Sequence, residues 1–252
     1  MVIELREMAR RFRGLDGNFS IVRDFFGYTG NSVPGSTSLT QELTQLRDNE
    51  HLTFHIKFVT TPTWAFTSGV SVDLMLFSMR RVYNAAGIGV ILGSTETLIL
   101  TDTDIMVDEC ISGRVTDDQT ALFNFRLNVG RNEIVVYLVR SVFTTDADAP
   151  GGIGTANGCA TFPSGRPGTV VSGPMASRWT VAHEIGHVLG NRHIEAGVCP
   201  ICQTPPTTVG CDFNNIMTCC GTGSIPAGTL PIFNTDQINR IVDSDLTQLF
   251  ED

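Results

Sequence analysis

The stretch "WTVAHEIGHVLGNRH", Trp179–His193, constrains the fold of this 252-residue chain more than any other feature. His183 and His187 are four residues apart, which on a helix places them about 40° apart in direction and about 6 Å apart along the axis. The opposite side of the helix carries the apolar residues Val181, Ala182, Ile185, Val188 and Leu189. The spacing therefore predicts a helix over 178–190 that buries one face and directs two imidazoles towards a cleft.

Gly190 and His193 extend this pattern beyond the helix. If the helix continued, His193 would lie about 9 Å beyond His187 along the axis and point elsewhere. A glycine can adopt the left-handed conformation that ends a helix at little steric cost, and such a turn brings His193 back towards the other two histidines. Three neutral imidazoles with a fourth position left open are a typical donor set for catalytic zinc. The sequence therefore predicts one Zn²⁺ held by His183, His187 and His193.

Glu184 follows His183 directly, too close in sequence to join the same metal comfortably while both helical histidines bind it. We expect its carboxylate to act as general base on a water that the metal activates, and then to protonate the leaving amine. A set of core histidines or a purely structural metal site would leave this glutamate unexplained. Five fixed positions, H-E-x-x-H-x-x-G-x-x-H, are also much more specific than H-E-x-x-H alone. The pattern indicates metal-assisted hydrolysis of a peptide bond.

At these residues the chain resembles the metzincins, a clan of zinc endopeptidases with this extended motif and a methionine turn after it. Met217 in "NNIMTCC" matches the turn methionine, whose side chain in the clan lies beneath the three histidines. Ile194 after the third histidine and Cys219 two places after Met217 depart from several subfamilies. The resemblance favours an adamalysin-like or pappalysin-like member and implies protein or peptide substrates.

The resemblance also implies an α+β fold. Its upper subdomain has a twisted mixed five-stranded sheet and two helices, and its irregular lower subdomain ends in a C-terminal helix. In the clan, an edge strand upstream of the motif helix pairs with extended substrate. Here Gly151–Phe162 is the expected equivalent, and Gly158, Cys159, Ala160 and Thr161 are the expected substrate-binding residues. Residues 218–233 are expected to line the pocket for the residue after the scissile bond.

Local patterns divide the chain into a leader over 1–50, an upper catalytic part over 51–190 and a lower part over 191–252. The predicted strands are 52–60, 88–93 bending into 97–100, 132–141, 159–162 and 168–173. The predicted helices are 39–48, 71–86, 178–190 and 235–250. Residues 102–119 and 146–158 are predicted to be loops.

Composition excludes several classes of protein. A net charge of −9 argues against a nucleic-acid-binding protein, which needs a basic face. No apolar stretch is long enough for a membrane span, and the first residues lack the apolar region of a signal peptide. Six acids between Asp102 and Asp118 lack the spacing of a recognised calcium loop, so calcium is possible but unsupported. The sequence does not indicate an oligomeric state.

The chain has seven cysteines, and five of them fall in the last quarter, at Cys199, Cys202, Cys211, Cys219 and Cys220. Clustered cysteines in Gly- and Pro-rich sequence favour disulfides, an oxidising compartment and hence a secreted protein. The alternative is a second zinc site built from Cys199, Cys202, Cys219 and Cys220. The spacing indicates no particular pairing.

Two other functions stay open at the level of sequence. One is a binding protein that keeps a metzincin body and zinc but does not cleave its partner. The other is a zinc hydrolase of a non-peptide amide or ester.

Overall fold

The computed structural model describes residues 50–100, 106–107, 109–110, 113–144, 154–194 and 210–248. The strands are β1 (His51–Thr60), β2 (Gly89–Ile99), β3 (Met106–Val107), β4 (Ile134–Val139), β5 (Ser141–Thr144), β6 (Gly154–Ala156), β7 (Gly158–Cys159) and β8 (Gly168–Ser172). The helices are α4 (Val72–Ala85), α5 (Asp117–Leu122), α6 (Thr180–Val188) and α7 (Thr235–Val242), with a short 3₁₀ helix η2 (Thr222–Ser224). The predicted helix over 39–48 lies outside the described residues.

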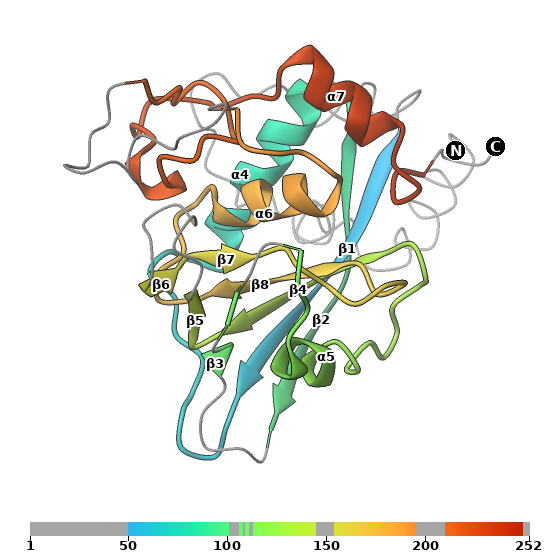
Figure 1. Cartoon of the computed structure of the whole chain (residues 1–252), viewed down its shortest axis with the longest axis vertical. Helices are drawn as coiled ribbons and strands as arrows, with labels where there is room; N and C mark the ends of the chain where they lie inside the picture. The colour runs from blue at the N-terminus through green and yellow to red at the C-terminus, as the bar shows by residue number, and fades with distance from the viewer. Residues whose placement is uncertain are drawn as a thin grey trace, which may run out of the picture.

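The main sheet has five strands in the order β2-β1-β4-β8-β7. Its first four strands are parallel, and β7 runs antiparallel to β8 at one edge (Figure 1). All six residues of β4 are buried, as expected for a strand in the interior of a parallel sheet. A smaller sheet joins β3, β5 and β6. The predicted α+β, metzincin-like fold with a mixed five-stranded sheet is confirmed.

The predicted bend between residues 88 and 100 is an irregularity within one strand. The register of β1 against β2 shifts by one residue between Phe54 and Ile56, so β2 carries an extra residue near Gly93. A Cβ at Gly93 would lie 2.4 Å from the ring of His55, and glycine therefore allows β2 to pass over that imidazole. Such a bulge bends a strand without ending it.

Helices α4 and α6 pack together on one face of the sheet (Figure 1). Ser71 caps α4 by accepting a hydrogen bond from the backbone N–H of Leu74, and Gly87 follows the helix with φ +79°. The buried Tyr83 hydroxyl donates to the carbonyl of Ala182 at 3.2 Å, which ties α4 to α6. The apolar face of α4 and the face of α6 opposite its histidines thus share one core.

The other face of the sheet is covered by α5, which corrects the prediction that 102–119 is a loop. Thr116 and Gln119 form a capping box, in which the threonine side chain accepts from the N–H of Gln119 and the glutamine side chain accepts from the N–H of Thr116. Phe123, at the end of α5, is fully buried and packs on Tyr137 of β4 with ring centroids 4.9 Å apart. The short strand β3 also falls in the predicted loop.

Three further boundaries differ from the prediction. Strand β6 lies in the predicted loop over 146–158 because it pairs with β5, a contact that no local pattern indicates. The predicted strand 159–162 is instead β7, Gly158–Cys159, because only these two residues pair with β8. The last helix ends at Val242 and not near Phe250, and a turn with a hydrogen bond from Thr247 Oγ1 to the Ile241 carbonyl follows it. In the part of the chain that the structure describes, no helix has the length and apolar character needed to cross a membrane.

Replacing either of two leucines by alanine should have very different effects on the free energy of unfolding, because only one of them lies in the core of the sheet. Leu138 on the central strand β4 is 1% exposed, whereas Leu127 is 73% exposed. Leu138→Ala should lower the free energy of unfolding by about 2–5 kcal/mol, because it removes buried methyl groups and leaves a cavity. Leu127→Ala should change it by less than about 0.5 kcal/mol. Urea unfolding of both variants checks this, and equal losses would contradict the assignment of β4 to the core.

Candidate metal centre

The helix that carries the first two histidines ends at the predicted glycine. Gly190 has φ +87°, a conformation that side chains rarely adopt. Its N–H donates to the carbonyl of His187 at 2.9 Å, and the N–H of Asn191 donates to the carbonyl of Gly186 at 3.0 Å. These bonds close the helix and reverse the chain, and His193 comes back to face α6.

The ring nitrogens of the three histidines converge on one point. The Nε2 atom of His187 lies 3.1 Å from those of His183 and His193, and the latter two are 3.3 Å apart. Tetrahedral zinc with N–Zn distances of about 2.0–2.1 Å requires nitrogens about 3.3 Å apart. The three side chains therefore match the donor set of a zinc ion, and they form a group that could hold a metal.

Backbone carbonyls hold two of the rings in the form that a metal needs. Nδ1 of His183 is 2.7 Å from the carbonyl oxygen of Ile216, and Nδ1 of His187 is 2.8 Å from that of Asn191. A carbonyl only accepts, so each Nδ1 carries the proton and donates it. Each Nε2 is then left with a free lone pair that can bind a cation, and the hydrogen bond at Nδ1 fixes the orientation of the ring.

Burial keeps the imidazoles neutral. It lowers the pKa of His187 and of His193 to about 4, with the neighbouring His193 adding to the effect on His187. Burial, followed by the two neighbouring rings, lowers the pKa of His183 well below its usual value. A neutral imidazole is the form that binds a metal, so the fold prepares the donors for a cation.

Glu184 lies between the histidines and the edge strand. The residue is 7% exposed, and burial raises the pKa of its carboxyl to about 8. A Cβ at Gly158 of β7 would lie only 2.6 Å from the Glu184 carboxyl carbon. The strand can therefore pass directly over the carboxylate because Gly158 has no side chain.

Met217 packs against the other side of α6 and is fully buried. A Cβ at Gly186 of α6 would lie 2.4 Å from its sulfur, so Met217 can approach the helix this closely because Gly186 has no side chain. The backbone around Met217 also contacts the segments that carry the histidines. The carbonyl of Ile216 accepts from Nδ1 of His183, and the carbonyl of Met217 accepts from the N–H of Ile194, which follows His193, at 3.2 Å.

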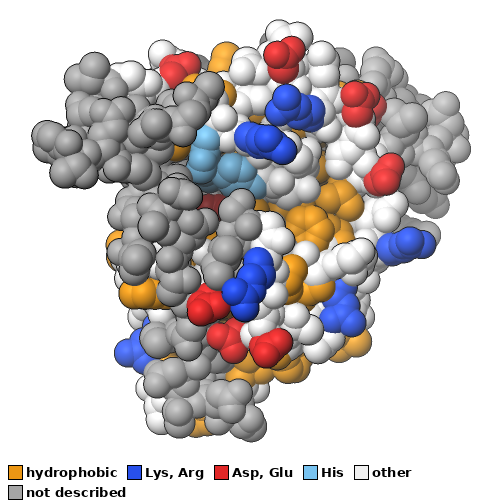
Figure 2. Space-filling model, in the orientation of Figure 1, with side chains coloured by type: hydrophobic (Ala, Val, Ile, Leu, Met, Phe, Trp, Pro, Cys, Tyr) orange, Lys and Arg blue, Asp and Glu red, His pale blue; other side chains and the backbone are white. Residues whose placement is uncertain are grey.

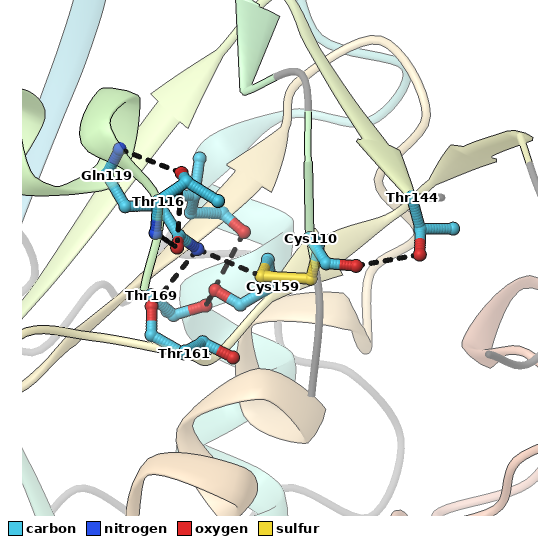
Figure 3. Close-up of a disulfide and its surroundings, with 8 residues drawn as sticks. Cys110, Thr116, Gln119, Thr144, Cys159, Thr161 and Thr169 are labelled. Carbon is cyan, nitrogen blue, oxygen red and sulfur yellow. Dashed lines mark hydrogen bonds between the residues drawn. A yellow bond between two sulfur atoms is a disulfide. The ribbon is translucent and has the colours of Figure 1, made fainter. Parts of the chain in front are cut away.

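A disulfide and a buried glutamine hold the edge strand. Cys159 of β7 is bonded to Cys110, whose carbonyl accepts from Thr144 Oγ1 at 2.7 Å (Figure 3). The Nε2 amide of Gln119 donates to the carbonyl of Thr161 at 3.2 Å and contacts the sulfur of Cys159 at 3.1 Å. Gln119 thus caps α5 with its oxygen and holds the chain after β7 with its nitrogen.

These parts enclose a cavity of about 1090 Å³. All three histidines, Glu184 and the predicted substrate-binding residues Gly158, Cys159, Ala160 and Thr161 line it. Gly190 lines it as well. Of the predicted pocket residues 218–233, four line the cavity: Thr218, Cys219, Gly221 and Thr222. Figure 2 shows histidine side chains exposed on this face of the molecule, with Lys or Arg side chains beside them.

The cysteines support the disulfide prediction over the second zinc site. Cys211 is bonded to Cys220, and Cys219 is disulfide-bonded as well. Neither Cys219 nor Cys220 is then available as a thiolate ligand. Disulfides of this kind are typical of an oxidising environment.

Several contacts at the site were not predicted. The Thr116-x-x-Gln119 capping box was readable as a local signal, since Ser or Thr followed by Glu or Gln at this spacing marks a helix start. The carbonyls of Ile216 and Asn191 gave no signal, because every residue has a carbonyl and only the fold decides where it points. Arg192 also lines the cavity, and no sequence signal indicates it because the motif leaves this position variable.

Comparison with known proteins agrees with this geometry. Residues 103–194, which include all three histidines, match the family model of the metallo-peptidase family M12B, Reprolysin-like. A crystal structure of metalloproteinase-II from Bacteroides fragilis is similar in fold, with 11% sequence identity and a TM-score of 0.41. The similarity covers 80% of this chain and 60% of that one. No curated protein sequence matches the chain.

The family match and the histidine cluster together support a metzincin-type metallopeptidase. The match spans less than half of the 252-residue chain and does not determine a subfamily. The family match ends at residue 194, so Met217 lies beyond it.

The lowered histidine pKa values predict how metal binding depends on pH. Protons compete with a metal for imidazole, and three ordinary histidines would lose roughly 500-fold in affinity between pH 7 and pH 5.5. Here the pKa values of His187 and His193 are about 4, so few protons are bound to the imidazoles in this range. In the Glu184→Gln variant, where the neighbouring carboxyl can no longer release a proton, the affinity should therefore change less than about threefold. Titration of the metal-free variant with cobalt(II), followed by its absorbance, measures this. A loss of a hundredfold or more would contradict it.

Proposed function

We propose that this protein is a zinc-dependent endopeptidase. His183, His187 and His193 hold the metal, Glu184 is the general base, and Met217 supports the helix from below. The observation that carries the proposal is the convergence of three Nε2 atoms within 3.3 Å, next to a buried carboxylate in an open cavity. When bound, zinc would supply Lewis-acid chemistry, polarising a carbonyl and lowering the pKa of water.

Glu184 moves the proton in this proposal. Its carboxylate lines the same cavity as the three histidines, and a cation held there would favour its charged form. The carboxylate removes a proton from the attacking water and then delivers it to the nitrogen of the leaving amine. Burial excludes bulk water from this transfer and strengthens its electrostatics.

The edge strand β7 and the residues after it position the substrate. Strand β7 stands last in the sheet order, so among the described strands only β8 pairs with it. An extended peptide could add to the free edge at Gly158–Thr161, next to Glu184. The disulfide to Cys110 and the Gln119 amide hold this edge in place for each substrate. Secretion agrees with the disulfides and is part of the proposal.

Glu184→Gln tests the chemistry. The amide keeps the shape of the side chain but cannot accept the proton, so kcat on a protein substrate such as casein should fall by about 10²–10⁴-fold. Zinc content, measured by elemental analysis, should stay at one ion per chain, because the three imidazoles are untouched.

The exposed Asp245→Asn is the matched control and should keep full activity. Full cleavage by Glu184→Gln would refute the assigned base. Failure of the zinc-loaded wild type to cut any protein or peptide would favour the non-catalytic binding protein, or a hydrolase of other amides and esters.

Gly158→Ala tests the clearance between the edge strand and the base. A methyl group there meets the Glu184 carboxyl at 2.6 Å, so the carboxylate or the strand must move. A displacement near 1 Å can cost about 10²-fold in rate, and we expect a loss of this order in kcat with zinc content unchanged. At Gly228 an added Cβ meets nothing within 4 Å, so Gly228→Ala should behave as wild type. Equal activity of the two variants would refute the close approach.

A further inference from the structure

Small and polar side chains make up most of the described lining of the cavity around the histidines. Apart from the histidines, Glu184 and Arg192, its described lining consists of Thr, Asn, Gly, Ala and Cys residues. Apolar pockets recognise apolar groups through walls of Leu, Ile, Val, Met or aromatic residues, none of which lines this cavity within the described part of the chain. The described part of the lining therefore offers polar contacts to substrate side chains.

Arg192 supplies the one permanent positive charge of this lining, counted over the described residues. It is exposed, and the structure shows no ion pair or hydrogen bond of its side chain with any described residue. It directly precedes His193, so the two Cα atoms are about 3.8 Å apart. A guanidinium stays charged at every physiological pH and binds a carboxylate through two parallel hydrogen bonds.

The rest of the lining offers Arg192 little competition. Glu184 is the only carboxylate among the described lining residues, and it is buried beneath Gly158. The chain as a whole has a net charge of −9, which repels acidic molecules at long range. An acidic side chain that enters the cavity therefore meets Arg192 as the one permanent positive charge among the described side chains that line it.

We propose that Arg192 is a specificity-determining residue that selects peptides with a Glu or Asp side chain within two residues of the scissile bond. This rests on the proposed endopeptidase function, since it names the substrate class of the same site. The short distance from Arg192 to the third histidine sets the distance of the acidic side chain from the bond that is cut.

Paired peptides test this proposal. Each pair differs only by Glu against Gln at one position, scanned over three residues on either side of the scissile bond. At one position the wild type should cleave the Glu peptide about tenfold better in kcat/KM, mainly through KM. Arg192→Gln should bring this ratio close to one, and Arg192→Lys should keep part of it. Arg240→Gln, on the exposed face of α7 outside the cavity, should keep the wild-type ratio.

Binding provides a readout that does not depend on cleavage. The zinc-loaded Glu184→Gln variant should bind the Glu peptide more tightly than the Gln peptide, measured by fluorescence anisotropy, and adding Arg192→Gln should remove the difference. Acidic preference in binding without cleavage by the wild type would refute the endopeptidase and keep Arg192 as the selective residue. A Glu-to-Gln ratio near one in the wild type, or a ratio that survives Arg192→Gln, would overturn the proposal about Arg192.

Discussion

The site depends on holding three nitrogen lone pairs within 3.3 Å of one another. Such an arrangement is unfavourable by itself, because three acceptors face each other with no proton between them and burial disfavours protonation. The fold maintains it through a left-handed turn at Gly190 and through carbonyls that bind Nδ1 of His183 and His187. A divalent cation would relieve this repulsion, which is the physical reason for expecting zinc here.

The surrounding structure holds the motif helix from three sides. Tyr83 of α4 binds the carbonyl of Ala182, Met217 packs against Gly186, and β7 passes over Glu184 at Gly158. The two glycine contacts are closer than any side chain would allow. Small displacements of Tyr83, Met217 or β7 would then move the Glu184 carboxylate or the imidazoles. The packing of the helix and the proposed chemistry are therefore coupled.

Strongly periodic elements were predictable, and elements defined by pairing were not. The alternation in β1 and the continuous apolar run of β4 are local signals, and the structure places both strands as expected. Strand β6 has three residues and exists because β5 lies beside it, so its own sequence resembles a loop. Helix α7 ends early because a turn at residues 243–247 takes over the backbone hydrogen bonds, although apolar residues continue to residue 249.

By itself, the sequence determined the donor atoms and the turn that gathers them, because the period of a helix and the freedom of a glycine are local properties. It also indicated which carboxylate accompanies the histidines. Only the tertiary structure decided what surrounds them: the carbonyl of Ile216 on His183, Gly158 over Glu184, and the Gln119 amide on Thr161 after β7. These contacts join residues far apart in the chain, and no local pattern encodes a distance between such residues.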